Sequence, residues 1–221
     1  MLLSAALGAL AFGQAVITDA ATPQARFAAC LAQIEADAVR GYEEAMAWAA
    51  ETHEMPAYRC AAMALEAQGA HAEAARRLTA LASAADAGEP AARAEILMQA
   101  GNAWLLAREP AQARSALTRA IALMAGDAAA LPDLLIDRAR AYAAEGDWRQ
   151  AEEDLSAALD LRAGDPLALR LRAVTRGHQG AYDLAMADAQ AAVAAEPADV
   201  EARLVLGHIR EAQRTGAMPE N

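Results

Sequence analysis

The sequence predicts an all-α protein, a solenoid of stacked antiparallel helix pairs, and three observations support that fold class. A 34-residue segment is followed by a second copy of itself, in which equivalent residues recur at a constant offset: Gly146 and Gly180, Trp148 and Tyr182, Ala151 and Ala185, Ala158 and Ala192. Apolar residues within each copy follow the helical spacing i, i+4, i+7, i+8. The chain is 56% hydrophobic but only 4% aromatic, which suits closely packed helices and leaves no room for a β-rich domain.

The copy over 132–165 shows how one unit is built. Leu135 and Tyr142 fall on one face of a first predicted helix. Gly146 then ends that helix, because glycine readily takes the positive φ of a helix terminus. A second amphipathic helix follows, and Pro166 suits the first turn of the helix that begins the next copy. Each unit is therefore expected to be a helix–turn–helix.

This pattern resembles the tetratricopeptide repeat, whose sequence reads W-x2-L-G-x2-Y, then A-x3-F, then P. The matching residues are Leu135-x2-Arg138-Ala139-x2-Tyr142 and Ala151-x3-Leu155 in one copy, and Leu169-x2-Arg172-Ala173-x2-Arg176, Ala185-x3-Ala189 and Pro197 in the next. The large positions are degenerate, whereas the alanines, the turn glycines and the period agree. The resemblance covers roughly residues 25–213 and implies a right-handed superhelix that holds other proteins.

The same register divides the rest of the chain. The interval from Ala113 to Ala151 is longer than the repeat period by four, so an insertion lies in the loop over 126–131. The interval from Ala74 to Ala113 is longer than the period by five, and that extra length falls in 84–90. The expected units are 25–84 as divergent N-terminal helix pairs, 91–124, 132–165 and 166–199 as three repeats, and 200–213 as a capping helix.

The first 21 residues are expected to be a signal peptide or an N-terminal membrane anchor. No charged residue occurs from Met1 to Ile17, and small residues suit cleavage after Ala20 or Ala21. We expect export to a bacterial periplasm, with a mature protein that begins near Ala21 or Thr22. Two alternatives remain: an uncleaved anchor in the inner membrane, and an apolar capping helix.

Two cysteines, Cys30 and Cys60, bear on the same question. They form no C-x-x-C pair and have no histidine at metal-ligand spacing, which argues against zinc and thioredoxin chemistry. In an exported protein they can form a disulfide that ties down the divergent end of the stack. The alternative is a pair of buried free thiols.

The sequence contains no motif typical of a catalytic, metal or cofactor site. The four histidines are scattered over different repeats, and the sequence contains no H-E-x-x-H, no G-x-S-x-G and no glycine-rich phosphate loop. Acidic residues outnumber basic ones by 30 to 19, so nucleic acid is not an expected partner. The membrane is an expected partner only through an uncleaved N-terminal segment.

The resemblance places a binding surface on the first helix of each pair, where the fifth and ninth positions line a concave groove. Here those positions are Arg59 and Met63, Met98 and Asn102, Ile136 and Arg140, Arg170 and Val174, and Leu204 and His208. Arginines among flexible apolar residues are expected to hold an extended or helical peptide through its carboxylates. The alternative is that they are solvated or paired with Glu95 and Asp133.

The expected function is therefore that of a non-enzymatic protein-interaction scaffold. Two alternatives are a membrane-tethered organiser of an envelope complex and an accessory subunit of a separately encoded enzyme. The chaperone-tail carboxylate clamp known in this family is not implied, because only Asn102 matches its residue set.

Overall fold

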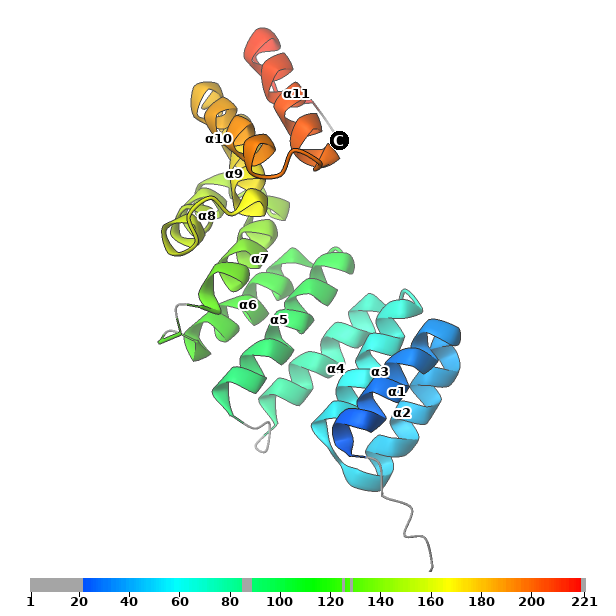
Figure 1. The fold of residues 1–221 in the computed structure, drawn as a ribbon. Helices are drawn as coiled ribbons and strands as arrows, with labels where there is room; N and C mark the ends of the chain where they lie inside the picture. Colours follow the sequence, from blue (N-terminus) through cyan, green and yellow to red (C-terminus); the bar gives the residue numbers. More distant parts are fainter. Residues whose placement is uncertain (1–21, 85–88, 125, 128, 220–221) are drawn as a thin grey trace, which may run out of the picture.

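The computed structural model describes residues 22–84, 89–124, 126–127 and 129–219, and within them the chain forms eleven α-helices and no strand. The helices stack in antiparallel pairs along a curved solenoid (Figure 1), which confirms the predicted fold class. Their bounds are α1 Pro23–Ala36, α2 Ala38–Thr52, α3 Met55–Ala67, α4 His71–Ser83, α5 Pro90–Leu106, α6 Pro110–Leu123, α7 Leu131–Ala144, α8 Trp148–Leu161, α9 Pro166–His178, α10 Tyr182–Ala195 and α11 Val200–Thr215. The predicted signal or anchor, residues 1–21, lies outside the described part.

The packing order determines which helices line the inner side of the curve. Each helix packs against the next one along the chain, so α1–α2, α3–α4, α5–α6, α7–α8 and α9–α10 form pairs and α11 packs on α9 and α10. First helices of neighbouring pairs also contact each other: α1 with α3, α5 with α7, α7 with α9, and α9 with α11. Because these first helices lie closest to one another, they form the inner, concave side of the stack.

Helix starts and turns follow the sequence signals. Proline occupies the first turn of α3, α5, α6, α7 and α9, where its missing N–H leaves no hydrogen bond unmade. The turn between α7 and α8 contains Gly146 at φ +78°, whereas the α5–α6 turn places Arg108 at φ +59°. A single residue, Asp37, separates α1 from α2, and its carboxylate accepts the backbone N–H groups of Val39 and Arg40 at 3.0 and 3.1 Å.

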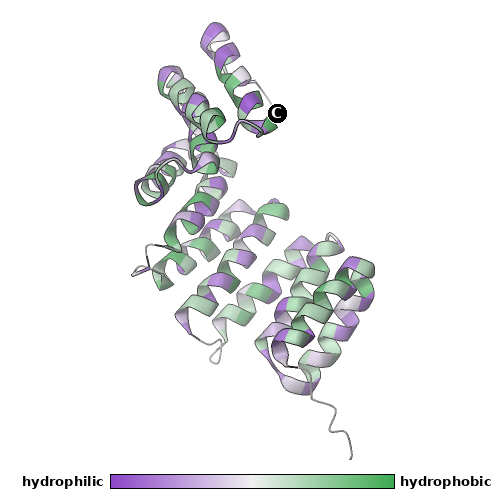
Figure 2. Cartoon of the chain, viewed as in Figure 1, coloured by the Kyte–Doolittle hydropathy of each residue, from purple (hydrophilic) through white to green (hydrophobic). Residues whose placement is uncertain are grey.

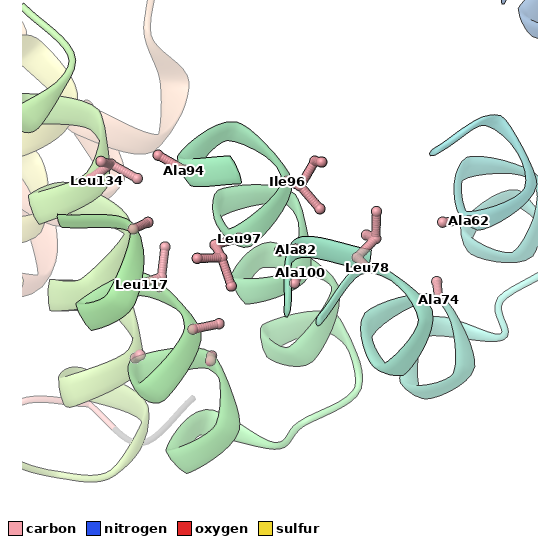
Figure 3. Packing of buried hydrophobic residues seen from close by; sticks show 14 of the residues in the cluster. Ala62, Ala74, Leu78, Ala82, Ala94, Ile96, Leu97, Ala100, Leu117 and Leu134 are labelled. Carbon is pink, nitrogen blue, oxygen red and sulfur yellow. The ribbon is translucent and has the colours of Figure 1, made fainter. Parts of the chain in front are cut away.

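The core consists of two main apolar clusters joined end to end. One runs from α3 to α7, and Figure 3 shows its alanines and leucines packed between successive helices. The other runs from α7 to α11. Figure 2 shows hydrophobic residues in every helix, interspersed with hydrophilic ones. The repeat alanines are fully buried, because a larger side chain would push the paired helices apart: Ala113, Ala151, Ala158, Ala185 and Ala192 are each 0% exposed.

Candidate functional site

The predicted groove residues gather most clearly between α9 and α11. Four of them, Arg170 and Val174 on α9 with Leu204 and His208 on α11, line one pocket of about 380 Å³. The segment after α11 supplies another wall through Met218 and Pro219. Leu204 is 56% exposed, a large solvent-facing area for an apolar side chain. The pocket therefore combines exposed apolar surface with a few polar groups.

The Arg170 side chain in this pocket is already paired within the chain. Its guanidinium contacts Glu201, and its Nε lies 3.6 Å from Oδ2 of Asp199, while the side chain is 19% exposed. Both acids belong to the start of α11 or the residue that caps it. Arg170 therefore ties α9 to α11, and its positive charge is largely compensated before any ligand binds.

The middle of the groove holds a polar network that links α5 to α7. Asn102 donates from Nδ2 to Oδ2 of Asp137 at 2.8 Å, and Arg140 donates from Nη1 to Oδ1 of Asn102 at 3.2 Å and to Oδ1 of Asp137 at 3.1 Å. The Arg140 side chain remains 45% exposed. Of the arginines expected to line the groove, Arg140 is thus the most available to an acidic group. Asp137 belongs to this network, and the positional rule for the groove did not include it.

At the N-terminal end of the groove, another ion pair joins α3 to α5. Arg59 on α3 donates from Nη2 to Oε1 of Glu95 on α5 at 2.5 Å, and its guanidinium lies 5.7 Å from the centroid of the Phe27 ring. Glu95 is one of the two acids named in the alternative above. Met63 and Met98 are half-buried, and Met98 lines, with Glu95, a pocket of about 320 Å³ between α5 and α7.

Ile136 does not line a surface. Its side chain is 3% exposed and belongs to the apolar cluster that runs from α7 to α11. Burial of a branched apolar side chain stabilises the folded protein, so Ile136 packs into the core although the repeat register assigns its position to the groove. The prediction that Ile136 contacts a ligand is therefore corrected.

A set of ion pairs between partly buried arginines and buried aspartates was not predicted from the sequence. Arg138 on α7 donates from Nε and Nη2 to the two carboxylate oxygens of Asp154 on α8, both at 2.7 Å. One repeat later, Arg172 and Asp188 repeat the same arrangement at 2.9 and 2.8 Å. We call these the two Arg–Asp pairs. Two parallel bonds to one carboxylate fix both distance and angle, so each pair sets how its two helices meet.

Arg176 connects the two units that contain the Arg–Asp pairs. Its Nη1 donates to Oδ2 of Asp188 at 2.8 Å, and its Nε donates to Oε1 of Glu152 on α8 at 2.7 Å. The carboxylate of Asp188 therefore receives two guanidinium groups. A signal for the Arg–Asp pairs exists in the sequence, because their arginines, at 138 and 172, and their aspartates, at 154 and 188, are each separated by the repeat period.

The two cysteines lie together, as a disulfide would require. Cys30 on α1 and Cys60 on α3 are paired, with Cα atoms 6.5 Å apart, inside the usual range for a disulfide. They lie in a small cluster with Ala45 and Ala61 that is separate from the two main clusters. A covalent bond between them would join helices from two different pairs.

His178, in the last turn of α9, also lines the pocket between α9 and α11 and makes an aromatic contact. His178 stacks on Trp148 with ring centroids 4.1 Å apart and planes 4° from parallel, and partial burial lowers the pKa of its imidazole. Among the residues that the structure describes, no three His, Cys, Asp or Glu side chains lie close enough together to hold a metal ion. None of the described helices is both long enough and apolar enough to cross a bilayer.

Comparison with known proteins identifies the fold. No family model matches the sequence, and no curated protein matches it. Among solved structures, the chain is similar to YrrB, a TPR protein with an unusual peptide-binding site, with a TM-score of 0.63 and 19% identity over 83% of this chain and 90% of YrrB. It is also similar to MamA (TM-score 0.57, 18% identity, 68% and 82% covered) and to the Sgt2 TPR domain from Aspergillus fumigatus (0.52, 24%, 60% and 89%). These likenesses show that the chain has the tetratricopeptide-repeat fold.

Proposed function

We propose that this chain, which has the tetratricopeptide-repeat fold, is a non-enzymatic scaffold that binds an extended segment of a partner protein in its concave groove. Two structural neighbours supply the analogy. YrrB is named for a peptide-binding site, and the first TPR of RPAP3 was solved bound to an HSP90 peptide, at 24% identity to this chain. The fold presents a ready-made concave surface, and stacked helix pairs use such surfaces to hold other chains.

One observation supports this proposal above the others: the pocket between α9 and α11. It brings four predicted groove residues together, and Leu204 at its edge leaves 56% of its area in water. Exposed apolar side chains around a concavity, with a few polar groups, are typical of binding sites.

The charges in the groove limit which kinds of ligand can bind there. Because Arg170 is compensated by Asp199 and Glu201, it contributes little to holding an anion. Arg140 is more exposed, although an incoming carboxylate would compete with Asp137 for it. The groove therefore suits a mainly apolar extended segment that carries an acidic residue near Arg140.

Partner capture with a matched pair of leucine variants tests the proposal. Leu204→Asp places a charge in the groove pocket, and Leu184→Asp places the same charge on α10, where Leu184 is 53% exposed and does not line this pocket. We expect affinity capture from native extracts to recover a partner with wild type and Leu184→Asp and to lose it with Leu204→Asp. Equal recovery by both variants, with helicity intact, would contradict groove binding. Recovery of one stoichiometric enzyme would identify the chain as an accessory subunit.

We also propose that the protein is exported to a periplasm and that Cys30 and Cys60 are bonded there. The uncharged N-terminal stretch and the paired position of the two cysteines support this proposal. Mass spectrometry of the native protein tests both parts. A mature start near Ala21 or Thr22 with no free thiol is expected. A native start at Met1 with an inner-membrane location would favour the tethered organiser, and two alkylatable thiols would rule out the bond.

A further inference from the structure

The chain turns back on itself after α11. Gly216 follows the last residue of α11 at φ +84°, a left-handed conformation that glycine takes without strain. The Gly216 N–H donates to the carbonyl of Ala212 at 2.7 Å, and the Thr215 hydroxyl lies 3.2 Å from the carbonyl oxygen of Ala217. These contacts close the turn, so that the segment 216–219, which we call the tail, lies against α9 and α11.

The Met218 side chain then fills a notch in α9. A Cβ atom added to Gly177 would lie 2.6 Å from Sδ of Met218 and 2.7 Å from Cδ1 of Ile209, so any side chain at 177 would displace both of them. Gly177 is buried in the last turn of α9. Glycine weakens a helix relative to alanine, so the notch offers a packing reason for glycine at this position.

The tail occupies part of the surface on which the proposed function depends. Met218 and Pro219 form a wall of the same pocket that Val174, Leu204 and His208 line. The groove of the free protein is thus partly filled by a short segment of its own chain. The side chain that enters the notch is long, unbranched and flexible, the type that best fills a narrow apolar gap.

We propose that the notch over Gly177 is a subsite for a flexible apolar side chain that is not branched at Cβ, methionine or leucine, of an extended ligand, and that the tail is its resident occupant. A partner segment binds there by displacing the tail. This inference rests on the proposed function and adds to it the kind of side chain that is recognised and the reason why the free groove is masked. A tethered occupant raises the apparent dissociation constant of any competitor, because only the fraction of molecules with an open groove can bind.

A labelled peptide that copies the tail tests the proposal on the full-length purified chain. The probe is fluorescein-labelled, amidated peptide 213–219, and binding is followed by fluorescence anisotropy. Met218→Asp should expel the tail, since a carboxylate is not stable in an apolar notch. We expect this variant to bind the probe about tenfold or more tightly than wild type does. Met218→Leu should keep the groove masked and bind the probe as weakly as wild type.

A matched pair of glycine variants locates the binding site. In the Met218→Asp background, Gly177→Ala fills the notch and should abolish probe binding. Gly207→Ala, on α11 with no atom within 4 Å of the added Cβ, should leave probe binding unchanged. A probe with aspartate in place of its methionine should not bind.

Three results would overturn the proposal. The first is equally weak binding of the probe to wild type and to a folded Met218→Asp chain. The second is tight binding that Gly177→Ala does not affect. The third is a wild-type dimer that Met218→Asp converts to a monomer, which would place the tail in the groove of a second molecule. Because the assay needs no natural partner, probe binding together with failed partner capture would refute the proposed function and leave the subsite intact.

Discussion

Two regions of the solenoid fill the same repeat positions with opposite chemistry. In the α5–α6 pair these positions hold Ala100 and Ala116, which are 0% and 3% exposed within the apolar cluster (Figure 3 shows Ala100). In the next pair, α7–α8, the equivalent positions hold Arg138 and Asp154, joined by two hydrogen bonds of 2.7 Å. The α9–α10 pair repeats the ionic arrangement. In the part of the chain that the structure describes, the buried charged side chains belong to this C-terminal region.

The difference teaches that the same helix-pair geometry can be built with buried alanines or with an ion pair. The two regions should, however, differ in their sensitivity to substitution. Alanine packing draws its stability from removal of apolar surface from water, so each residue contributes a small share. A buried ion pair recovers its desolvation cost only while both partners are present. The α5–α6 interface should therefore tolerate the loss of one small apolar side chain better than an Arg–Asp pair tolerates the loss of one partner.

Asp188→Ala should have the largest effect on this comparison. Its carboxylate accepts from both Arg172 and Arg176, whose side chains are 17% and 14% exposed, and its loss leaves two guanidinium groups without that acceptor. We expect the free energy of unfolding to fall by about 3–5 kcal/mol, measured by urea denaturation. Asp160→Ala, an exposed acid on α8, is the control and should change stability by about 0.5 kcal/mol or less. Similar losses of unfolding free energy in the two variants would mean that the Arg–Asp pairs contribute no more to stability than an exposed charge does.

Removal of the proposed cysteine bond should have an effect of similar size, and it should act on the other end of the stack. A loop of 30 residues closed by a disulfide stabilises the folded state by on the order of 3 kcal/mol in the chain-entropy account. Reductant should lower the melting temperature of the wild type and should leave Cys60→Ser unaffected. A wild-type protein from an oxidising compartment that does not respond to reductant would show that α1–α3 is held by packing alone.

Replacing a whole Arg–Asp pair by apolar residues should cost less than breaking it. We expect Asp154→Leu alone to destabilise the protein by about 3 kcal/mol or more, and Arg138→Met with Asp154→Leu to stay within about 2 kcal/mol of wild type. This double variant imitates the apolar α5–α6 interface in the α7–α8 pair. A double-mutant cycle by urea denaturation gives the coupling energy. Additive losses would indicate that the two side chains act independently.

The smallest effect concerns the turns of the two regions, and it should be stabilising. Arg108 takes φ +59° at the place where the α7–α8 turn has Gly146. A left-handed conformation costs a non-glycine residue about 1 kcal/mol, so Arg108→Gly should raise the free energy of unfolding by roughly that amount. Gly146→Arg is the converse variant, and it should lower stability by a similar amount, since open space surrounds Gly146. No change in either variant would show that the turns are relaxed in both regions.

The sequence allowed the fold to be predicted because the repeat period, the helical spacing and the turn signals are all local patterns. The Arg–Asp pairs could also have been found, since their residues recur with the repeat, but Arg138 and Arg172 were treated as degenerate forms of an apolar consensus position. Ile136 was misplaced because register alone does not determine which way a side chain near a helix interface turns. The packing of Met218 against Gly177 follows no period, so tertiary structure was needed to find it.

The Cys30–Cys60 connection, when the bond is formed, also has a mechanical consequence. A pulling force applied between the two ends of the solenoid would extend the chain as helices come apart. The covalent ring removes the 30-residue stretch between its cysteines from that extension. At about 3.5 Å per residue, the fully stretched oxidised molecule would be roughly 100 Å shorter than the reduced one. In a single-molecule trace, the oxidised and reduced proteins should therefore differ in total length as well as in the force at which the first helices yield.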